Sequence, residues 1–204
     1  RAFYRGSLVL LWTLAAALVV LWLVTRRPWD QLGLVLRLNG GLAGVIAGLA
    51  AMVAVLARRQ RVAPDDRQAL AKLEKDAGQL ARLLPASGGE FGWFAAVSVS
   101  AGICEEALYR GFLIWYLGAW AAMLVPGPHV FVVAAAGSAL VFGLGHSYQG
   151  WRNTLVTALT GGFLAAVYWI TGSLYAAMLI HALMDLQAGY TSYAAHAAAR
   201  VTEA

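Results

Sequence analysis

The chain has 204 residues, of which 61% are hydrophobic and only 12% are charged, and its mean hydropathy is +0.67. These values exclude an ordinary soluble globular domain and indicate a polytopic helical membrane protein. The net charge of +5 does not indicate nucleic-acid binding, because the basic residues gather at the ends of apolar runs and form no stripe with interleaved aromatic residues. The single cysteine, Cys104, excludes an intrachain disulfide and a multi-cysteine zinc site.

The first 90 residues consist of two apolar runs and a polar connector. The run from Ser7 to Val24 is long enough to cross a hydrocarbon core of about 30 Å. Asn39 is a predicted N-cap for the second run, 40–57, in which glycine recurs at the four-residue spacing of closely packed membrane helices. These glycines are Gly40, Gly44 and Gly48. In residues 58–90, apolar residues, mostly leucines, recur every three or four positions, which predicts an amphipathic helix at the membrane surface.

Four further apolar runs follow, at 91–125, 130–146, 154–170 and 173–193. The first is longer than one span needs, so it predicts either one long tilted helix or a span followed by a half-helix that turns near Gly111 or Gly118. We therefore expect an all-α transmembrane helical bundle with about six membrane spans and one amphipathic surface helix.

The expected bundle has two parts. Residues 1–90 supply two N-terminal transmembrane helices and the connector, and residues 91–204 form the core. Most Lys and Arg residues fall on the side of the two termini, which predicts cytoplasmic termini.

Three charged residues, Glu105, Glu106 and Arg110, lie in the middle of the run 91–125. An ionisable residue at the bilayer centre costs about 2.5 to 3.5 kcal/mol on insertion scales, so such residues are candidates for function. Glu106 and Arg110 are four residues apart with the acid nearer the amino end, which favours an ion pair on one helical face. Glu105 points about 100° away, and its carboxylate is left free. A buried salt bridge alone does not explain why this second carboxylate is held in lipid.

Two histidines are also embedded in apolar runs. They are His146 and His181, and Asp185 lies one helical turn after His181 on the same face. His129 and His196 lie in a turn and in the C-terminal tail and are not site candidates.

The buried polar set is therefore Glu105, Glu106, Arg110, His146, His181 and Asp185. It suits hydrolysis, in which a carboxylate takes a proton from water while imidazoles orient that water or stabilise an oxyanion. It equally suits a divalent ion such as zinc, bound by two histidines and carboxylates. A proton-coupled transporter would also bury such groups, but we find no internal repeat of the kind expected there.

Three motifs in this order, all in apolar runs, carry a resemblance to a known family. They are Glu-Glu-x-x-x-Arg at 105–110, Phe-x-x-x-His at 142–146 and His-x-x-x-Asp at 181–185. The sequence from about 91 to 189 resembles the CPBP family of intramembrane proteases, which comprises CAAX prenyl proteases and bacteriocin-processing proteins.

The resemblance implies an intramembrane endopeptidase of the prokaryotic plasma membrane that acts on a peptide or a lipid-modified protein among membrane lipids. It implies that Glu105 and His146 activate the attacking water and that the pair Glu106 and Arg110 holds the helix. His181 and Asp185 would then stabilise the oxyanion. The alternative function is a non-catalytic immunity or scaffold protein that uses the same polar cluster to bind a partner.

Asp185 departs from the pattern, because the prenyl-protein enzymes of the family carry asparagine there. An ionised aspartate cannot donate a hydrogen bond to an oxyanion. Three interpretations stay open: Asp185 is protonated, it orients His181, or it is a ligand of a metal held by Glu105, His146, His181 and Asp185. The cofactor is accordingly either none or a divalent metal such as zinc, and the enzyme is either a glutamic protease or a metalloprotease.

Overall fold

The computed structural model describes residues 2–37, 39–48, 75 and 78–201, and every regular element in these ranges is helical. This confirms the predicted all-α fold. Among the described residues, the longer helices of the bundle are α1 (Ala2–Val24), α4 (Gly88–Glu105), α5 (Ile114–Ala121), α6 (His129–Gly145), α7 (Trp151–Thr171) and α8 (Leu174–Val201). Short turns of helix are η1 (Trp29–Leu32), η2 (Gly78–Leu83), η3 (Glu106–Leu113) and η4 (Ser147–Gln149).

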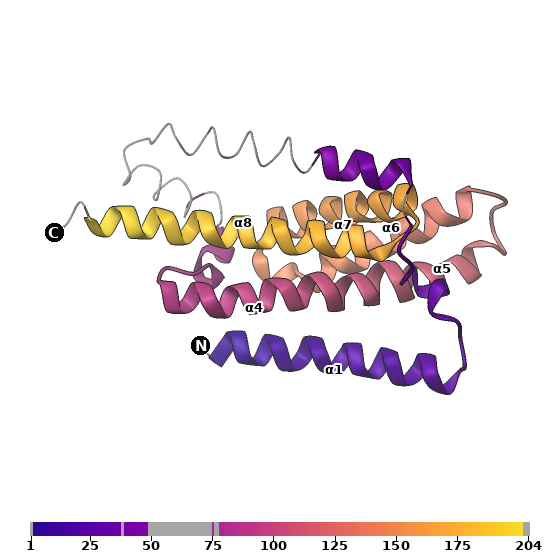
Figure 1. Ribbon diagram of the computed structural model, residues 1–204, viewed down its shortest axis with the longest axis horizontal. Coiled ribbons are helices and arrows are strands. Elements are labelled where there is room, and N and C mark those ends of the chain that lie inside the picture. The colour runs from indigo at the N-terminus through magenta and orange to yellow at the C-terminus, as the bar shows by residue number, and fades with distance from the viewer. Residues whose placement is uncertain (1, 38, 49–74, 76–77, 202–204) are drawn as a thin grey trace.

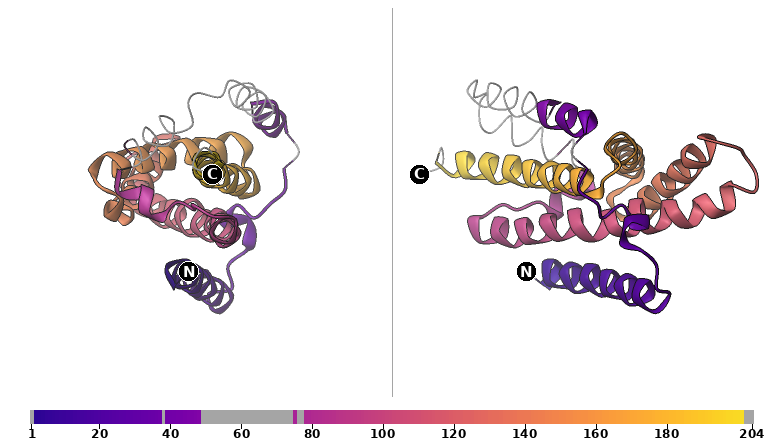
Figure 2. Two further views of the ribbon diagram at one scale, coloured as in Figure 1. Left: turned by 90° about the vertical axis from the view of Figure 1, so that its left-hand side faces the viewer. Right: turned by 45° about the vertical axis from the view of Figure 1, so that its right-hand side comes forward.

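The long helices lie side by side, so the connections gather at the two ends of the bundle. The start of α1, the start of α4 and the end of α8 lie at one end (Figure 1). The segment η1, the α5–α6 turn and the α7–α8 turn lie at the other end, and the second view agrees (Figure 2). An additional helical stretch, residues 40–48, lies beside α7 and α8, and its Leu42 and Val45 pack against their buried side chains.

The helix that carries the charged cluster does not break near Gly111. The segments α4, η3 and α5 run continuously as one helical stretch of 34 residues, Gly88–Ala121. Its middle part, η3, is a π-helix, in which the backbone N–H of Ile114 bonds to the carbonyl of Tyr109 five residues earlier. The alternative of one long helix is therefore right, and the break is wrong. Gly111 instead permits close packing, since a Cβ there would lie 3.0 Å from the carbonyl oxygen of Leu32.

Three helices are long and apolar enough to cross a membrane by length and composition, within the described residues: α1, Gly88–Ala121 and α7. Helix α6 is apolar but shorter. About six spans were expected, and the second of them, 40–57, is described only as far as residue 48. Large apolar side chains on the outside of α1, such as Val9 and Val24, are 69% and 75% exposed, as suits a lipid-facing helix.

The predicted start of the second run is confirmed. The side-chain oxygen of Asn39 accepts a hydrogen bond from the backbone N–H of Leu42 at 2.9 Å, as an N-cap does. Gly40, Gly44 and Gly48 make no close helix contact within the described residues, since a Cβ at any of them would meet nothing within 4 Å there. Gly41 makes the close approach instead, to Ile170 of α7. The predicted surface helix falls in 58–90, which is described only at residue 75 and from residue 78 onward.

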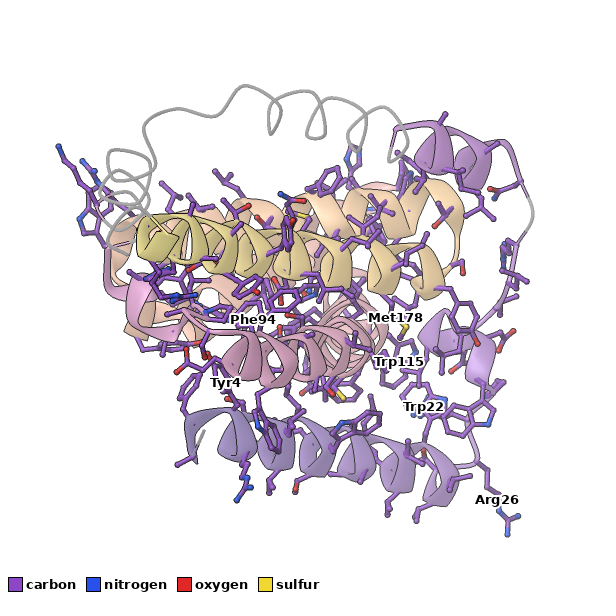
Figure 3. The ribbon with its side chains drawn as sticks, turned by 60° about the vertical axis from the view of Figure 1, so that its left-hand side comes forward. Tyr4, Trp22, Arg26, Phe94, Trp115 and Met178 are labelled. Atoms are coloured by element: carbon purple, nitrogen blue, oxygen red, sulfur yellow. The ribbon has the colours of Figure 1, made fainter. Side chains whose placement is uncertain are left out.

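Glycines on the site-bearing helices set how closely those helices pack. A Cβ at Gly102 of α4 would lie 2.8 Å from the carbonyl oxygen of Met178 on α8, and one at Gly143 of α6 would lie 2.8 Å from that of Thr154 on α7. Helices in lipid associate by such close packing. Figure 3 shows Phe94 and Met178 at the interface of α4 and α8. Trp22 of α1 meets Trp115 of α5 edge-on at 5.2 Å between ring centroids.

The start of α4 is fixed by its own residues. The hydroxyl of Ser87 accepts the backbone N–H of Glu90 at 3.3 Å, and the Glu90 carboxylate accepts the backbone N–H of Ala86 at 3.0 Å. This is a form of the capping box. It defines where the helix begins, and thereby the rotation at which it presents Glu105 and Glu106.

Candidate active site

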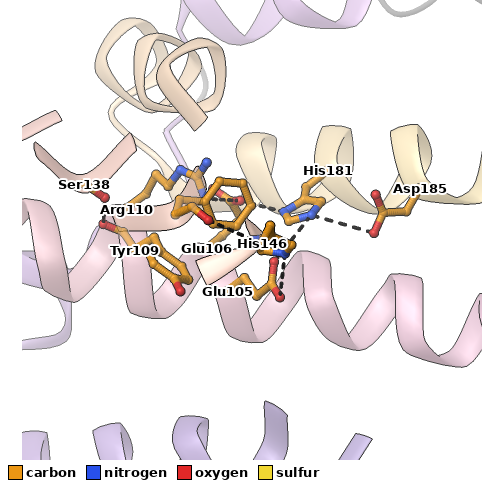
Figure 4. A network of polar contacts seen from close by, with 9 residues as sticks. Glu105, Glu106, Tyr109, Arg110, Ser138, His146, His181 and Asp185 are labelled. Carbon is orange, nitrogen blue, oxygen red and sulfur yellow. Dashed lines mark hydrogen bonds and ion pairs between the residues drawn. The ribbon is translucent and has the colours of Figure 1, made fainter. Parts of the chain in front are cut away.

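Four segments bring the predicted site residues together (Figure 4). Glu105 is the last residue of α4, Glu106 and Arg110 belong to η3, His146 follows the end of α6, and α8 carries the remaining two. These two are His181 and Asp185. All six side chains inferred from the sequence thus belong to one continuous set of polar contacts.

The pair formed by Glu106 and Arg110 is sealed inside the bundle. Glu106 is 0% and Arg110 is 1% exposed, and Nη1 of the arginine donates to Oε1 of the glutamate at 2.9 Å. The atoms Glu106 Oε2 and Arg110 Nη2 have no hydrogen-bond partner among the described residues. A buried pair with unsatisfied atoms is costly to keep. We therefore expect it to serve the site and not only the stability of the fold.

Each histidine is held through its Nδ1 atom. Nδ1 of His146 lies 2.8 Å from the carbonyl oxygen of Phe142, and Nδ1 of His181 lies 2.7 Å from Oε1 of Glu106. A carbonyl oxygen and an ionised carboxylate only accept hydrogen bonds, so both Nδ1 atoms must carry the proton. In the neutral imidazole, both Nε2 atoms then present a lone pair.

The two Nε2 atoms flank the carboxylate of Glu105. Nε2 of His146 lies 3.9 Å from Oε1 of Glu105, and Nε2 of His181 lies 3.8 Å from Oε2. These separations are too long for direct hydrogen bonds and short enough for one water to bridge. The Glu105 side chain is 16% exposed, in contrast to its sealed neighbour.

Asp185 lies at the rim of the site. Its side chain is 40% exposed, and its Oδ2 lies 3.7 Å from Nε2 of His181. The orientation of the His181 ring comes from Glu106 on the Nδ1 side, so Asp185 faces the reactive side of the ring.

Sequence reasoning gave no role to Phe142 or Ser138. The Phe142 ring lies 4.4 Å from the Arg110 guanidinium, within cation–π range, and 4.7 Å from the His146 ring. The hydroxyl of Ser138 donates to the carbonyl of Tyr109 at 2.8 Å, on the π-helix. The sequence carries a signal for them, because Ser138, Phe142 and His146 recur every four residues, along one face of α6 and its C-cap.

No group of three or more His, Cys, Asp and Glu side chains is arranged to hold a metal ion in the described ranges. A cavity of about 460 Å³ lies toward the other end of the bundle, where Asp30, Arg37, Tyr168 and Trp169 line it. Of the polar set, only Arg110 borders this cavity, so it is separate from the space in front of Glu105.

A family model described as type II CAAX prenyl endopeptidase Rce1-like matches residues 87–187. This part of the chain is similar to the CAAX protease family. All six residues of the polar set fall inside the matched range. No curated protein and no solved structure matches the chain. The CAAX protease match and the apolar spans indicate an integral membrane protein with a protease function.

Proposed function

We propose that the chain is an intramembrane endopeptidase in which Glu105 acts as the general base on water. The observation that carries this proposal is the position of the Glu105 carboxylate between two imidazole Nε2 atoms, at 3.8 and 3.9 Å. A hydrogen bond at Nδ1 fixes the orientation of each imidazole ring. The arrangement presents one carboxylate and two acceptor nitrogens to the same small space.

In the proposed reaction, a water bound between Glu105 and His146 loses a proton to the Glu105 carboxylate. The resulting hydroxide adds to the carbon of the scissile carbonyl, whose oxygen becomes negatively charged. Collapse of this intermediate breaks the C–N bond, and the proton held by Glu105 passes to the leaving amine. The sealed pair of Glu106 and Arg110 does not react. It fixes the His181 ring by accepting its Nδ1–H.

The proposed substrate is a peptide segment or a lipid-modified protein tail that approaches from the membrane, as the family description suggests. We propose a prokaryotic plasma membrane with both termini in the cytoplasm, since the basic residues favour that side. The rival proposal is a non-catalytic immunity or scaffold protein that binds a partner through the same polar cluster. It predicts function without the carboxylate of Glu105.

The test is peptide cleavage by purified protein reconstituted in nanodiscs. Glu105→Gln and His146→Ala should each lower kcat by about 10²- to 10⁴-fold, the usual contribution of a general base. The matched control is His129→Ala, at the opposite end of α6, which should cleave normally. Cleavage by Glu105→Gln at the unmodified rate would refute the proposed role of Glu105.

A chelator separates the metal-free reaction from the metalloprotease alternative. We expect cleavage to survive dialysis against EDTA and 1,10-phenanthroline, because the site works through carboxylate and imidazole alone. Loss of activity that zinc restores would instead assign Glu105, His146, His181 and Asp185 to a metal.

A further inference from the structure

The candidate site is rich in hydrogen-bond acceptors and poor in donors. Both histidines use their Nδ1–H groups to bond to Phe142 and Glu106, so their Nε2 atoms can only accept while the rings are neutral. The carboxylates of Glu105 and Asp185 also only accept when ionised. Peptide hydrolysis nevertheless places a negative charge on the carbonyl oxygen, and enzymes stabilise that charge with pre-positioned donors. A hydroxyl next to Glu105 would supply such a donor whatever the charge of the two imidazoles.

Tyr109 supplies a hydroxyl in the right region. It lies in η3, and Figure 4 shows its side chain and that of Glu105 extending from the same side of the helix. Its Oη lies beside the backbone of the residue that precedes His146, since a Cβ at Gly145 would be only 3.3 Å from it. The hydroxyl makes no hydrogen bond to the described part of the chain, and the residue is partly exposed. The O–H group is thus free to meet a substrate.

The ring and backbone of Tyr109 are both held in place. The ring packs edge-on against Phe142 at 4.9 Å between centroids, and Ser138 bonds to the Tyr109 carbonyl at 2.8 Å. The π-helical turn leaves Tyr109 partly exposed, whereas its neighbour Arg110 is fully buried. Pre-positioned donors of this kind need no reorganisation during the reaction.

We propose that the Tyr109 hydroxyl donates a hydrogen bond to the carbonyl oxygen of the scissile peptide as that oxygen becomes negative. This inference rests on the proposed function and adds a catalytic residue to it. The phenolic proton stays on Tyr109 throughout, so the step needs no further acid or base. It also explains how a chain with aspartate at position 185 can still stabilise an oxyanion.

Tyr148 provides a matched control. Its ring lies 5.9 Å from that of His146, so it is also a tyrosine near the site. However, it is 56% exposed, and its hydroxyl already accepts a hydrogen bond from Gln149 at 3.3 Å. A loss of its hydroxyl should not affect the reaction.

The first test measures kcat and KM of Tyr109→Phe and Tyr148→Phe on the same peptide in nanodiscs. Tyr109→Phe keeps the ring and its packing, so Tm and KM should be unchanged while kcat falls about 10²-fold, as for loss of one oxyanion donor. Tyr148→Phe should retain kcat within about twofold. Full activity of Tyr109→Phe, with Glu105→Gln inactive, would overturn the inference and leave the proposed function standing. An active Glu105→Gln would overturn the proposed function itself.

The second test asks whether a donor placed elsewhere compensates. Asp185→Asn places an amide N–H₂ group at the rim of the site. In the native chain, Oδ2 of Asp185 lies 3.7 Å from Nε2 of His181 at this position. In the Tyr109→Phe background, Asp185→Asn should recover at least tenfold of the lost kcat. Absence of recovery, with Asp185→Asn active on its own, would assign Tyr109 a packing role and overturn the inference.

Discussion

The junction of α4 and η3 presents two adjacent glutamates to two different surroundings. Glu106 is fully buried, bonds to Arg110 and His181, and lies on the side that packs against α8. Glu105 is 16% exposed and makes no direct hydrogen bond within the described residues, with its nearest nitrogens at 3.8 and 3.9 Å. We call these the sealed side and the open side. The difference indicates that one carboxylate positions the site and the other performs the chemistry.

The strongest test of this contrast is the stability of Glu106→Gln against Glu105→Gln. Removing the charge of Glu106 leaves the buried guanidinium of Arg110 uncompensated, which should cost about 3 to 5 kcal/mol of the free energy of unfolding. Glu105→Gln leaves no buried charge behind and should change stability by less than about 1 kcal/mol. Unfolding in detergent, followed by circular dichroism, measures both.

A double variant shows whether the cost comes from the unpaired charge. Glu106→Gln combined with Arg110→Met replaces both members of the pair, and such replacements are often close to neutral. The double variant should therefore be more stable than Glu106→Gln alone. Equal destabilisation of the two would mean that shape, and not charge, holds the sealed side.

The packing of the sealed side gives a second, smaller effect. Gly102 lies one turn before Glu106 on the same face, and a Cβ there would lie 2.8 Å from the backbone of Met178. Gly102→Ala should lower the free energy of unfolding by about 1 to 3 kcal/mol, since the backbone of α8 must shift. Gly92→Ala is the matched control on α4, because a Cβ there meets nothing within 4 Å. If Gly102→Ala were as stable as Gly92→Ala, the sealed side would be looser than its glycine contacts imply.

The sequence predicted the sealed side better than the open side. Spacing alone predicted the pairing of Glu106 with Arg110, because residues four apart share a helical face whatever the rest of the chain does. The sequence also placed His146 and His181 in the interior, because ionisable groups in membrane-spanning runs almost always face the interior of the bundle. The contact between His181 and Glu106 joins residues 75 positions apart, and no local pattern encodes such a distance.

The π-helix could not be predicted from the sequence either. Ordinary helical periodicity assumes bonds four residues back, whereas in η3 Ile114 bonds five residues back. The rotation of Tyr109 relative to Glu105 depends on that change. The hydrogen bond from Ser138 to the Tyr109 carbonyl and the close approach of Leu32 to Gly111 stabilise it. These are tertiary contacts, which override local preference.

The smallest effect is expected for Asp185→Asn alone. Asp185 lies at the 40% exposed rim of the open side, so the change should alter the free energy of unfolding by no more than about 0.5 kcal/mol. Asparagine keeps the shape and supplies a donor next to His181, so kcat should be retained or should rise, while Asp185→Ala should not give that rise. A loss of stability comparable to that of Glu106→Gln would place Asp185 on the sealed side. His181, which lies next to both glutamates, would then mark the boundary between the two sides in place of Asp185.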